Sequence, residues 1–264
     1  MGGCKMEIIC FIKQVPDNEA QVEVKGDGTG VNVEERYGLN FFDSLAVEEA
    51  LRIKEKAGGK VTAITLGPER SVEVLRTAIA MGVDEAHLIS DSSLQEGDEV
   101  STARVLAEAA KKIGYDLILC GREAFDDSSG AVGPMVAEFL GIPAVSVVTK
   151  VEVHPEERKA VVEREMEGGK EEIELPLPAL LTAQKGLNEP RVPPVMGVMK
   201  AMKAEIKRWN LGDLGLDAQE VAPRGKTIRY VPPPKRPPVR YIKGEPQEMA
   251  KELVELLRDE AKVI

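Results

Sequence analysis

The chain has 264 residues, of which 43% are hydrophobic and 30% charged, as in a globular protein with room for one large domain or one domain and an appendage. Its net charge of -10 argues against nucleic-acid partners and against an anionic membrane surface, because both need basic patches. No apolar run approaches the roughly 20 residues of a membrane span. The N-terminus also lacks a secretion signal, so we expect a cytoplasmic protein, associated with a membrane only through a partner complex.

Cysteine and histidine are too scarce for most site chemistries. The two histidines, His87 and His154, lie far apart, and Cys4, Cys10 and Cys120 form no CxxC pair, so we expect no zinc or iron–sulfur site and no disulfide framework. Cys10 and Cys120 lie inside apolar runs and are predicted to be core residues. The shortage of histidine removes most acid–base and Ser–His schemes, and we predict no catalytic residue.

Apolar runs and helical stripes alternate through the first half of the chain. Short apolar runs predict strands over 7–12, 60–66, 85–89, 116–120 and 143–148. Helices are predicted from an N-cap at Asp43 or Ser44 to a C-cap at Gly58, and over 71–81, 99–113 and 135–140. Residues 16–39 are polar and glycine-rich, with room for an edge hairpin around 26–28. The alternation is typical of a parallel sheet covered on both faces, in which ligands bind beyond the carboxyl ends of the strands.

The pattern changes after residue 148. A hairpin over 149–154 and 160–165, a third antiparallel strand over 170–176 and a buried strand over 179–182 are expected. Proline-rich sequence then predicts an extended arm over 206–245, before an amphipathic helix over 248–262 with Met249, Leu253, Leu256 and Leu257 on one face. We expect the arm to lie on another protein; the alternative is an arm that folds back on its own domain.

The predicted fold class is therefore α/β: a Rossmann-like parallel-sheet nucleotide-binding domain with a small antiparallel β addition and an extended C-terminal arm ending in a helix. Residues 1–184 form the domain, with 149–184 as the antiparallel addition and last strand. Residues 185–205 form a partner-docking loop and short helix, and residues 206–264 form the arm.

The loop CGREAFDDSSGAVGP, residues 120–134, joins a buried strand to a helix and is longer than most such loops. Its serines and Gly130 offer hydroxyl and backbone N–H groups, and the helix that follows favours a phosphate at its N-terminus. Asp126 and Asp127 suit the capping of amides or acceptance of hydrogen bonds from a ribose or ribityl chain. The loop is neither a Walker A motif nor GxGxxG, so it predicts a nucleotide site without NTPase or hydride-dehydrogenase signatures. The alternative is a loop that only connects the strand to the helix and binds no ligand.

Several stretches, in order along nearly the whole chain, resemble the β subunit of electron transfer flavoproteins. They are IKQVPD, LNFFDSLAVEEALRIKE, LGP, RTAIAMGVDEAHLI, CGREAFDDSSGAVGP and VEREMEGGKEEIELPLPALLTAQKGLNEPRVPPVMGVMKAMK. The resemblance implies a heterodimer with a larger α subunit that carries a redox FAD, and an arm that wraps on that partner.

The resemblance leaves the ligand of the β subunit open. In the ordinary class the pocket holds structural AMP, and the subunit docks acyl-CoA-type dehydrogenases. In the electron-bifurcating class it holds a second FAD, which takes a hydride from NADH; electrons then pass to ferredoxin or flavodoxin and to a quinone oxidoreductase or dehydrogenase acceptor. Val132, Gly133 and Pro134 look more like bifurcating members, which favours FAD, and NADH oxidation is expected only within such a complex. A stand-alone nucleotide-binding signalling domain is a third reading, against which the arm and the LNEPR loop count.

The resemblance also implies particular site residues. The cofactor-binding set is Phe11, Ile12, Lys13, Asn40, Phe41, Phe42, Asp43, Leu66, Gly67, Arg122, Ala124, Asp126, Asp127, Ser128, Ser129, Gly130, Ala131, Val132 and Gly133. Arg122 would lie near a flavin, where a cation stabilises the reduced anion; a surface ion pair is the alternative. The partner-docking set is Arg191, Val195, Met196 and Met199. Two departures from the family pattern stand out: Ala131 replaces a glutamine, and Phe41 replaces a proline.

Overall fold

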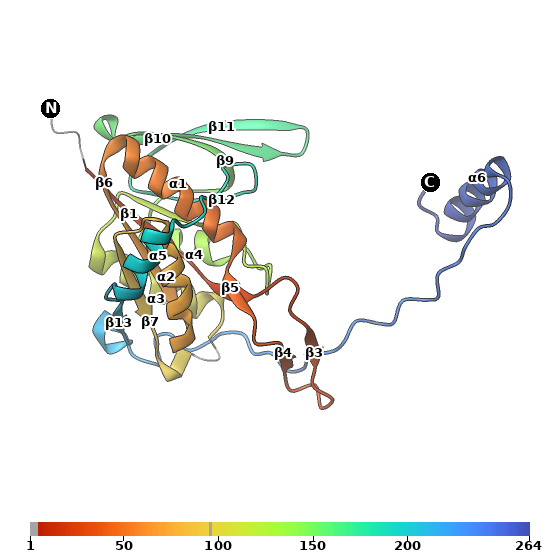
Figure 1. Ribbon diagram of the computed structural model, residues 1–264, viewed down its shortest axis with the longest axis horizontal. Coiled ribbons are helices and arrows are strands. Elements are labelled where there is room, and N and C mark those ends of the chain that lie inside the picture. Colours follow the sequence, from red (N-terminus) through yellow and green to blue (C-terminus); the bar gives the residue numbers. More distant parts are fainter. Residues whose placement is uncertain (1–4, 95–96) are drawn as a thin grey trace.

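A nine-stranded sheet forms the centre of the molecule (Figure 1). The computed structural model describes residues 5–94 and 97–264, so the prediction for Cys4 lies outside the described residues. The sheet order is β11-β10-β9-β12-β8-β1-β6-β7-β13. Seven strands are parallel, namely β1 (Met6–Phe11), β6 (Gly59–Leu66), β7 (Glu85–Ile89), β8 (Leu117–Gly121), β9 (Ala144–His154), β12 (Ala179–Ala183) and β13 (Lys207–Trp209). The strands β10 (Lys159–Met166) and β11 (Gly169–Pro176) extend it as an antiparallel hairpin.

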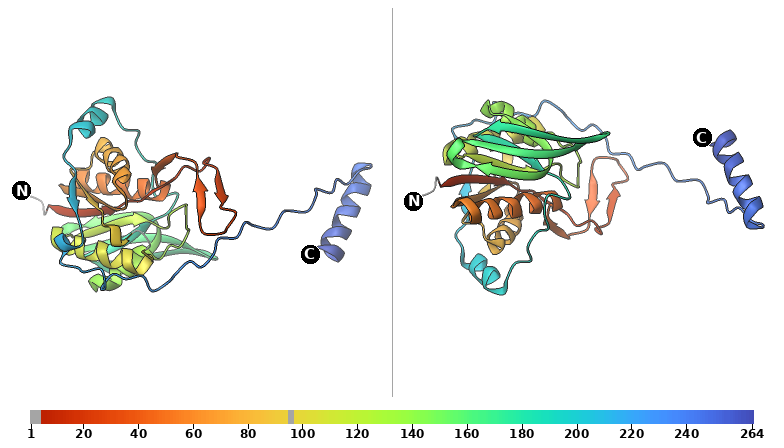
Figure 2. Two further views of the ribbon diagram at one scale, coloured as in Figure 1. Left: turned by 90° about the horizontal axis from the view of Figure 1, so that it is seen from below. Right: turned by 90° about the horizontal axis from the view of Figure 1, so that it is seen from above.

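Helices cover both faces of the sheet, on opposite sides of β1 (Figure 2). The helices α1 (Phe41–Ala57) and α2 (Val72–Met81) pack on one face, where Ile8 and Cys10 point into the core. The helices α3 (Glu99–Ile113) and α4 (Val132–Leu140) pack on the other face, which receives Ile9 and Cys120. Because successive side chains of a strand point to opposite faces, burial on both sides explains why these strands read as continuous apolar runs.

The strand order creates a switch point beside β1. From β1 the chain runs outward through β6 and β7, and it then returns to place β8 on the opposite side of β1. The connections after β1 and β8 therefore leave on different faces, and a crevice opens between the carboxyl ends of these two strands.

The alternating elements confirm the predicted fold class, with local differences. The helix α1 begins at Phe41 with Asn40 as the residue before it, not at an N-cap on Asp43 or Ser44. The helix α4 begins at Val132, ahead of the apolar stretch 135–140 and as expected of a helix opened by residues 132–134. The two segments expected over 143–154 form one strand, β9. The hairpin expected around 26–28 is present as β3 (Val22–Val24) and β4 (Val31–Val33), next to the pair β2 (Gln14–Pro16) and β5 (Tyr37–Leu39).

The C-terminal part divides into a packed and an extended section. After α5 (Val195–Lys203), β13 pairs with β7, although this segment was predicted to be extended. Four apolar side chains between 206 and 221 are buried against the domain, namely Ile206, Leu211, Leu216 and Val221. The extended course begins after Val221 and ends in α6 (Pro246–Glu255) and a π-helical turn (Leu256–Glu260), which lie well away from the sheet (Figure 1). Short 3-10 helices occur at Glu69–Ser71, Ser92–Leu94, Pro155–Glu157 and Gly212–Leu214.

Candidate nucleotide-binding site

A cavity of about 970 Å³ opens at the carboxyl ends of β1, β6 and β8. Most of the residues proposed from the sequence line it, namely Phe11, Ile12, Lys13, Asn40, Asp43, Leu66, Arg122, Ala124, Asp127, Ser129, Gly130, Ala131, Val132 and Gly133. Five others lie outside its lining, namely Phe41, Phe42, Gly67, Asp126 and Ser128. Residues distant in sequence thus meet at the switch point because their strands end there.

Asp43 joins the two strands of the switch point. Its Oδ2 accepts a hydrogen bond from Lys13 N at 2.8 Å, and its Oδ1 accepts one from Gly121 N at 2.8 Å. The side chain is buried, and burial raises the pKa of Asp43 to about 7 against the lowering effect of these two amides. A methyl group on Gly121 would lie 2.5 Å from Asp43 Oδ1, so only glycine lets the carboxylate approach.

Asn40 holds the loop that follows β8. Its Nδ2 donates to Glu123 O at 2.8 Å, and its Oδ1 accepts from Phe125 N at 3.3 Å. Asn40 is 1% exposed, so both ends of this amide are used inside the protein. The ring of Phe125 packs on Phe42 at 5.2 Å between centroids and on Phe41 at 6.1 Å, which joins the loop to α1. The predicted role of Asn40 and Phe42 in the site therefore includes shaping this loop.

An ion-pair cluster lies at one side of the cavity. Lys13 Nζ lies 2.8 Å from a carboxylate oxygen of Asp126 and 2.8 Å from one of Asp127. Burial would lower the pKa of Lys13, but the hydrogen bonds to both carboxylates outweigh it, and the pKa is raised. Asp127 Oδ1 also accepts from Ser129 N at 3.0 Å, which turns the loop. Asp126 and Asp127, which the sequence suggested for capping amides or accepting from a ribose or ribityl chain, thus both pair with Lys13.

The first turn of α4 lines the cavity, and its first backbone N–H groups have no hydrogen-bond partner among the residues that the structure describes. Ala131 precedes the helix and caps it with no side-chain hydrogen bond, and no acidic residue lies in the first turn. Backbone N–H groups at such a position have no partner within the helix and favour an anion. A methyl group on Gly133 would lie 2.9 Å from Cys120 Sγ, so glycine lets the helix approach β8 closely. Gly130 has φ +61°, which favours glycine in the loop.

Arg122 follows β8 and borders the cavity. Its Nη2 lies 2.6 Å from Glu123 Oε1, and its guanidinium lies 4.9 Å from the centre of the Phe42 ring. Its Nε is buried and has no hydrogen-bond partner within the described part of the chain. Because a buried donor without a partner is costly, the site is suited to a ligand that presents an acceptor here.

Sequence reasoning missed three parts of the lining. The N-terminus of α3 contributes Asp98, Glu99 and Thr102, the turn of the β3–β4 hairpin contributes Thr29, and the arm contributes residues 223–227 and Tyr230. The start of α3 could have been found, because it follows β7 at the same edge of the sheet. The arm carried no signal, since its lining residues follow β13 in a stretch without helical or strand periodicity.

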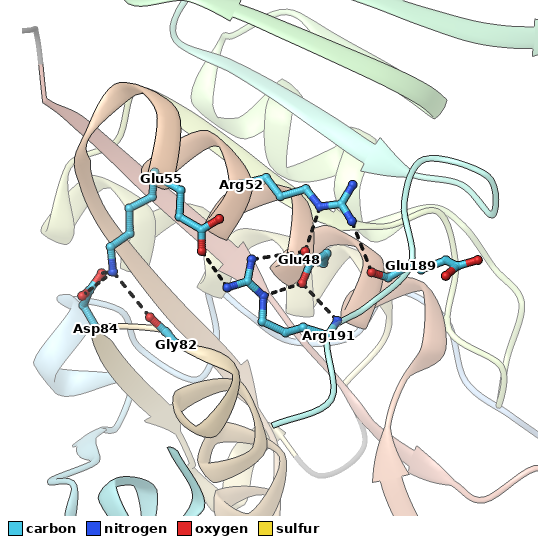
Figure 3. A network of polar contacts seen from close by, with 8 residues as sticks. Glu48, Arg52, Glu55, Gly82, Asp84, Glu189 and Arg191 are labelled. Atoms are coloured by element: carbon cyan, nitrogen blue, oxygen red, sulfur yellow. Dashed lines mark hydrogen bonds and ion pairs between the residues drawn. The ribbon is translucent and has the colours of Figure 1, made fainter. Parts of the chain in front are cut away.

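The region proposed for docking is fastened to the middle of α1 (Figure 3). Arg191 Nε lies 2.7 Å from Glu48 Oε2, and Arg191 Nη1 lies 2.6 Å from Glu55 Oε1. Glu48 is 3% exposed and also accepts from Arg52 Nε at 2.8 Å. Burial would raise the pKa of Glu48, but the bonds from Arg191 and Arg52 outweigh it and hold the pKa below its ordinary value. Arg191 therefore positions the segment before α5.

The helix α5 exposes most of its apolar side chains. Val195 is 77% exposed, Met196 74% and Met202 71%, while Met199 is 51% exposed. On its inner side Gly197 packs so closely on α2 that a methyl group there would lie 2.3 Å from Ala80 O. The structure thus fixes the helix while leaving its apolar face open.

The described residues offer neither a membrane-spanning helix nor a metal site. No helix among residues 5–94 and 97–264 combines the length and apolar character needed to cross a membrane. Within the same ranges, no group of three or more His, Cys, Asp or Glu side chains is arranged to hold a metal ion. Cys10 and Cys120 are free and buried, as expected of core residues, and burial raises the pKa of both thiols.

Comparison with known proteins gives concordant matches. The family model described as "Electron transfer flavoprotein domain" matches residues 29–214. The chain is 43% identical to "Electron transfer flavoprotein subunit beta" of Bacillus subtilis, over 98% of this chain and 100% of the relative. It is 39% identical to "Caffeyl-CoA reductase-Etf complex subunit CarD" of Acetobacterium woodii, over 96% and 98%. It is 34% identical to "Electron transfer flavoprotein subunit beta, mitochondrial" of Arabidopsis thaliana, over 98% and 100%.

Proposed function

This chain belongs to the electron transfer flavoprotein family as a β subunit, and from that premise we propose that it holds FAD in the cavity at its switch point. We further propose that it works as a heterodimer with an α subunit and takes part in electron bifurcation. In this scheme NADH is the donor, and the electrons go to ferredoxin or flavodoxin and to a quinone oxidoreductase or dehydrogenase acceptor.

The size and lining of the cavity support the proposal that the chain binds FAD. Its volume of about 970 Å³ lies at the upper end of the range for small-molecule sites, which leaves room for a dinucleotide. The amides at the start of α4 suit the pyrophosphate, and the close packing at Gly133 brings them to the sheet edge. The unpartnered Nε of Arg122 suits an acceptor on the ligand. The residues present therefore fit a phosphate-bearing cofactor.

When bound, FAD would supply hydride acceptance and the release of electrons one at a time. The role of this chain is to bind and orient it. Arg122 would bring a positive charge that favours the reduced anion, and the packing of its guanidinium on Phe42 fixes its direction. Asp43 and Asn40 would hold the loop that carries Arg122 in place, since they bond the backbone at Gly121 and Glu123.

Two surfaces support the proposed partners. The exposed face of α5, with Val195, Met196 and Met199, suits a redox partner that offers an apolar patch. The arm beyond Val221 exposes apolar side chains along its length, such as Ile228 at 94% and Tyr241 at 78%, and these suit burial against the α subunit. The likeness to CarD, whose name places it in a reductase–Etf complex, and Val132, Gly133 and Pro134 favour the bifurcating class over the AMP-holding class.

The test is a count of nucleotides in the protein co-expressed with its α subunit. Heat-released nucleotides are separated by chromatography, and we expect two FAD and no AMP per heterodimer. NADH should then bleach the flavin absorbance of the intact heterodimer. One FAD and one AMP per heterodimer would contradict the FAD assignment and reduce this chain to a structural and docking subunit.

A further inference from the structure

The segment 223–230 of the arm contributes to the wall of the cavity, and we call it the strap. Residues 223–227 and Tyr230 line the cavity together with the strand ends. The strap leaves the domain after Val221 and passes the β3–β4 hairpin before the arm runs outward (Figure 1). The rest of the arm lies away from the sheet, so the strap is the part of it that can meet a ligand.

Both ends of the strap are fastened to the domain by hydrogen bonds. Asp98 Oδ2 accepts from Arg224 N at 2.6 Å and from Gly225 N at 2.9 Å. At the other end, Tyr230 N donates to Gly28 O at 2.9 Å, on the turn of the β3–β4 hairpin. Asp98 uses its second oxygen, Oδ1, to accept from Ser101 N at 2.9 Å and so caps α3. One carboxylate thus joins the helix start to the strap.

The charges around the cavity differ between the domain and the strap. In the domain, Lys13 is paired with Asp126 and Asp127, and Arg122 is paired with Glu123. In the strap, the side chains of Arg224 and Lys226 form no ion pair with any residue that the structure describes. The strap therefore brings two cations without a carboxylate partner in the described part of the chain to the cavity, in addition to the unpartnered Nε of Arg122.

We propose that Arg224 and Lys226 bind the phosphates of the nucleotide and that the strap forms the outer wall of its site. The inference rests on the proposed function, because it takes the ligand to carry phosphate groups. Cationic side chains make short, strong hydrogen bonds to phosphate oxygens, and the cations of the domain already have carboxylate partners. Asp98 is a positioning residue, because it holds the backbone of Arg224 and Gly225 at the cavity, which both residues line.

The first experiment compares two double variants in the heterodimer with the α subunit. The variant Arg224→Ala/Lys226→Ala removes the two strap cations. The control Lys235→Ala/Arg236→Ala removes the same charge about ten residues further along, where both side chains are exposed and neither lines the cavity. Dissociation constants for AMP and for FAD are measured by calorimetry after the nucleotide is removed.

We expect the strap variant to bind the nucleotide at least tenfold more weakly than the control, since two charge-assisted contacts are lost. Equal affinity of the two variants, with the wild-type protein binding normally, would overturn the inference and leave the proposed function intact. A wild-type heterodimer that binds neither nucleotide would instead contradict the proposed function itself.

A second measurement follows the strap directly by hydrogen exchange of the peptide 223–231. We expect added nucleotide to slow its exchange in the wild-type heterodimer and to have little effect in Asp98→Ser. The serine keeps one oxygen to cap α3 but cannot also accept from the strap. Exchange that is equally slow with and without nucleotide in the wild-type protein would contradict a strap that takes part in binding.

Discussion

Two buried carboxylates on the same helix behave in opposite ways. Asp43, in the first turn of α1, is bonded to two backbone amides, and burial raises its pKa to about 7. Glu48, little more than one turn further along, is bonded to two arginines, and its pKa is lowered. Two amides outweigh the burial of Asp43 only in part, whereas the two guanidinium groups outweigh that of Glu48, which is less deeply enclosed. The comparison shows that the partner, and not burial alone, decides the charge state.

The largest expected effect is on the pH dependence of stability at Asp43. Its folded pKa of about 7 lies above the ordinary 3.8, so its contribution is complete below about pH 4 and is lost as the pH rises through 7. The free energy of unfolding of wild type relative to Asp43→Asn should therefore fall by about 4 kcal/mol between pH 4 and 8. Urea unfolding at several pH values measures this difference.

Glu48 supplies the opposite case for the same experiment. Its folded pKa lies below the ordinary 4.5, so its contribution is present above pH 4.5 and is lost as the pH falls. As the pH rises towards 4.5, the free energy of unfolding of wild type should therefore increase relative to that of Glu48→Gln. At higher pH it should fall relative to that of Asp43→Asn. Parallel curves for the two variants would break the comparison.

The next effect concerns the amides that Asp43 holds. Asp43→Ala leaves the N–H groups of Lys13 and Gly121 without their acceptor, which should cost about 3 kcal/mol in the free energy of unfolding at pH 6. Asp27→Ala removes an exposed carboxylate that accepts from Thr29 N in a surface turn, and it should cost much less than Asp43→Ala. A similar loss from both variants would show that Asp43 is not needed to join β1 and β8.

A smaller loss of stability than at Asp43 is expected at Arg191. Arg191→Ala leaves buried Glu48 with Arg52 alone, and we expect a loss of about 2 kcal/mol, with slower binding of the redox partner as α5 loses its anchor. The control Arg164→Ala breaks a surface pair with Glu171 and should cost about 0.5 kcal/mol. Thermal unfolding measures the stability of both variants. Equal losses of stability would mean that the burial of Glu48 does not strengthen its ion pair with Arg191.

The sequence predicted the sheet better than it predicted the contacts of the site. Apolar runs mark strands buried on both faces, so the positions of β1, β6, β7 and β8 could be predicted from these runs alone. Asp43 was predicted as a helix cap because capping is a local pattern, whereas its partners lie 30 and 78 residues away. Such long-range roles have no local signature.

The start of the arm also makes contacts that local sequence patterns did not predict. The strand β13 has only three residues and no clear alternation, so nothing in the sequence separated it from the extended segment. The apolar residues Ile206, Leu211, Leu216 and Val221, spaced five apart, were the available signal that the chain still packs on the domain. The contacts of the strap with Asp98 depend on tertiary placement and could not be read locally.

The exposed arm has a consequence for the life of the subunit in the cell. Beyond Val221 the chain runs without regular structure up to α6, with apolar side chains such as Val239 at 73% exposure. Extended, exposed segments are the preferred substrates of proteases. A copy that finds no partner should therefore be trimmed near the start of the arm, and matched amounts of the two subunits would be maintained by degradation of the excess.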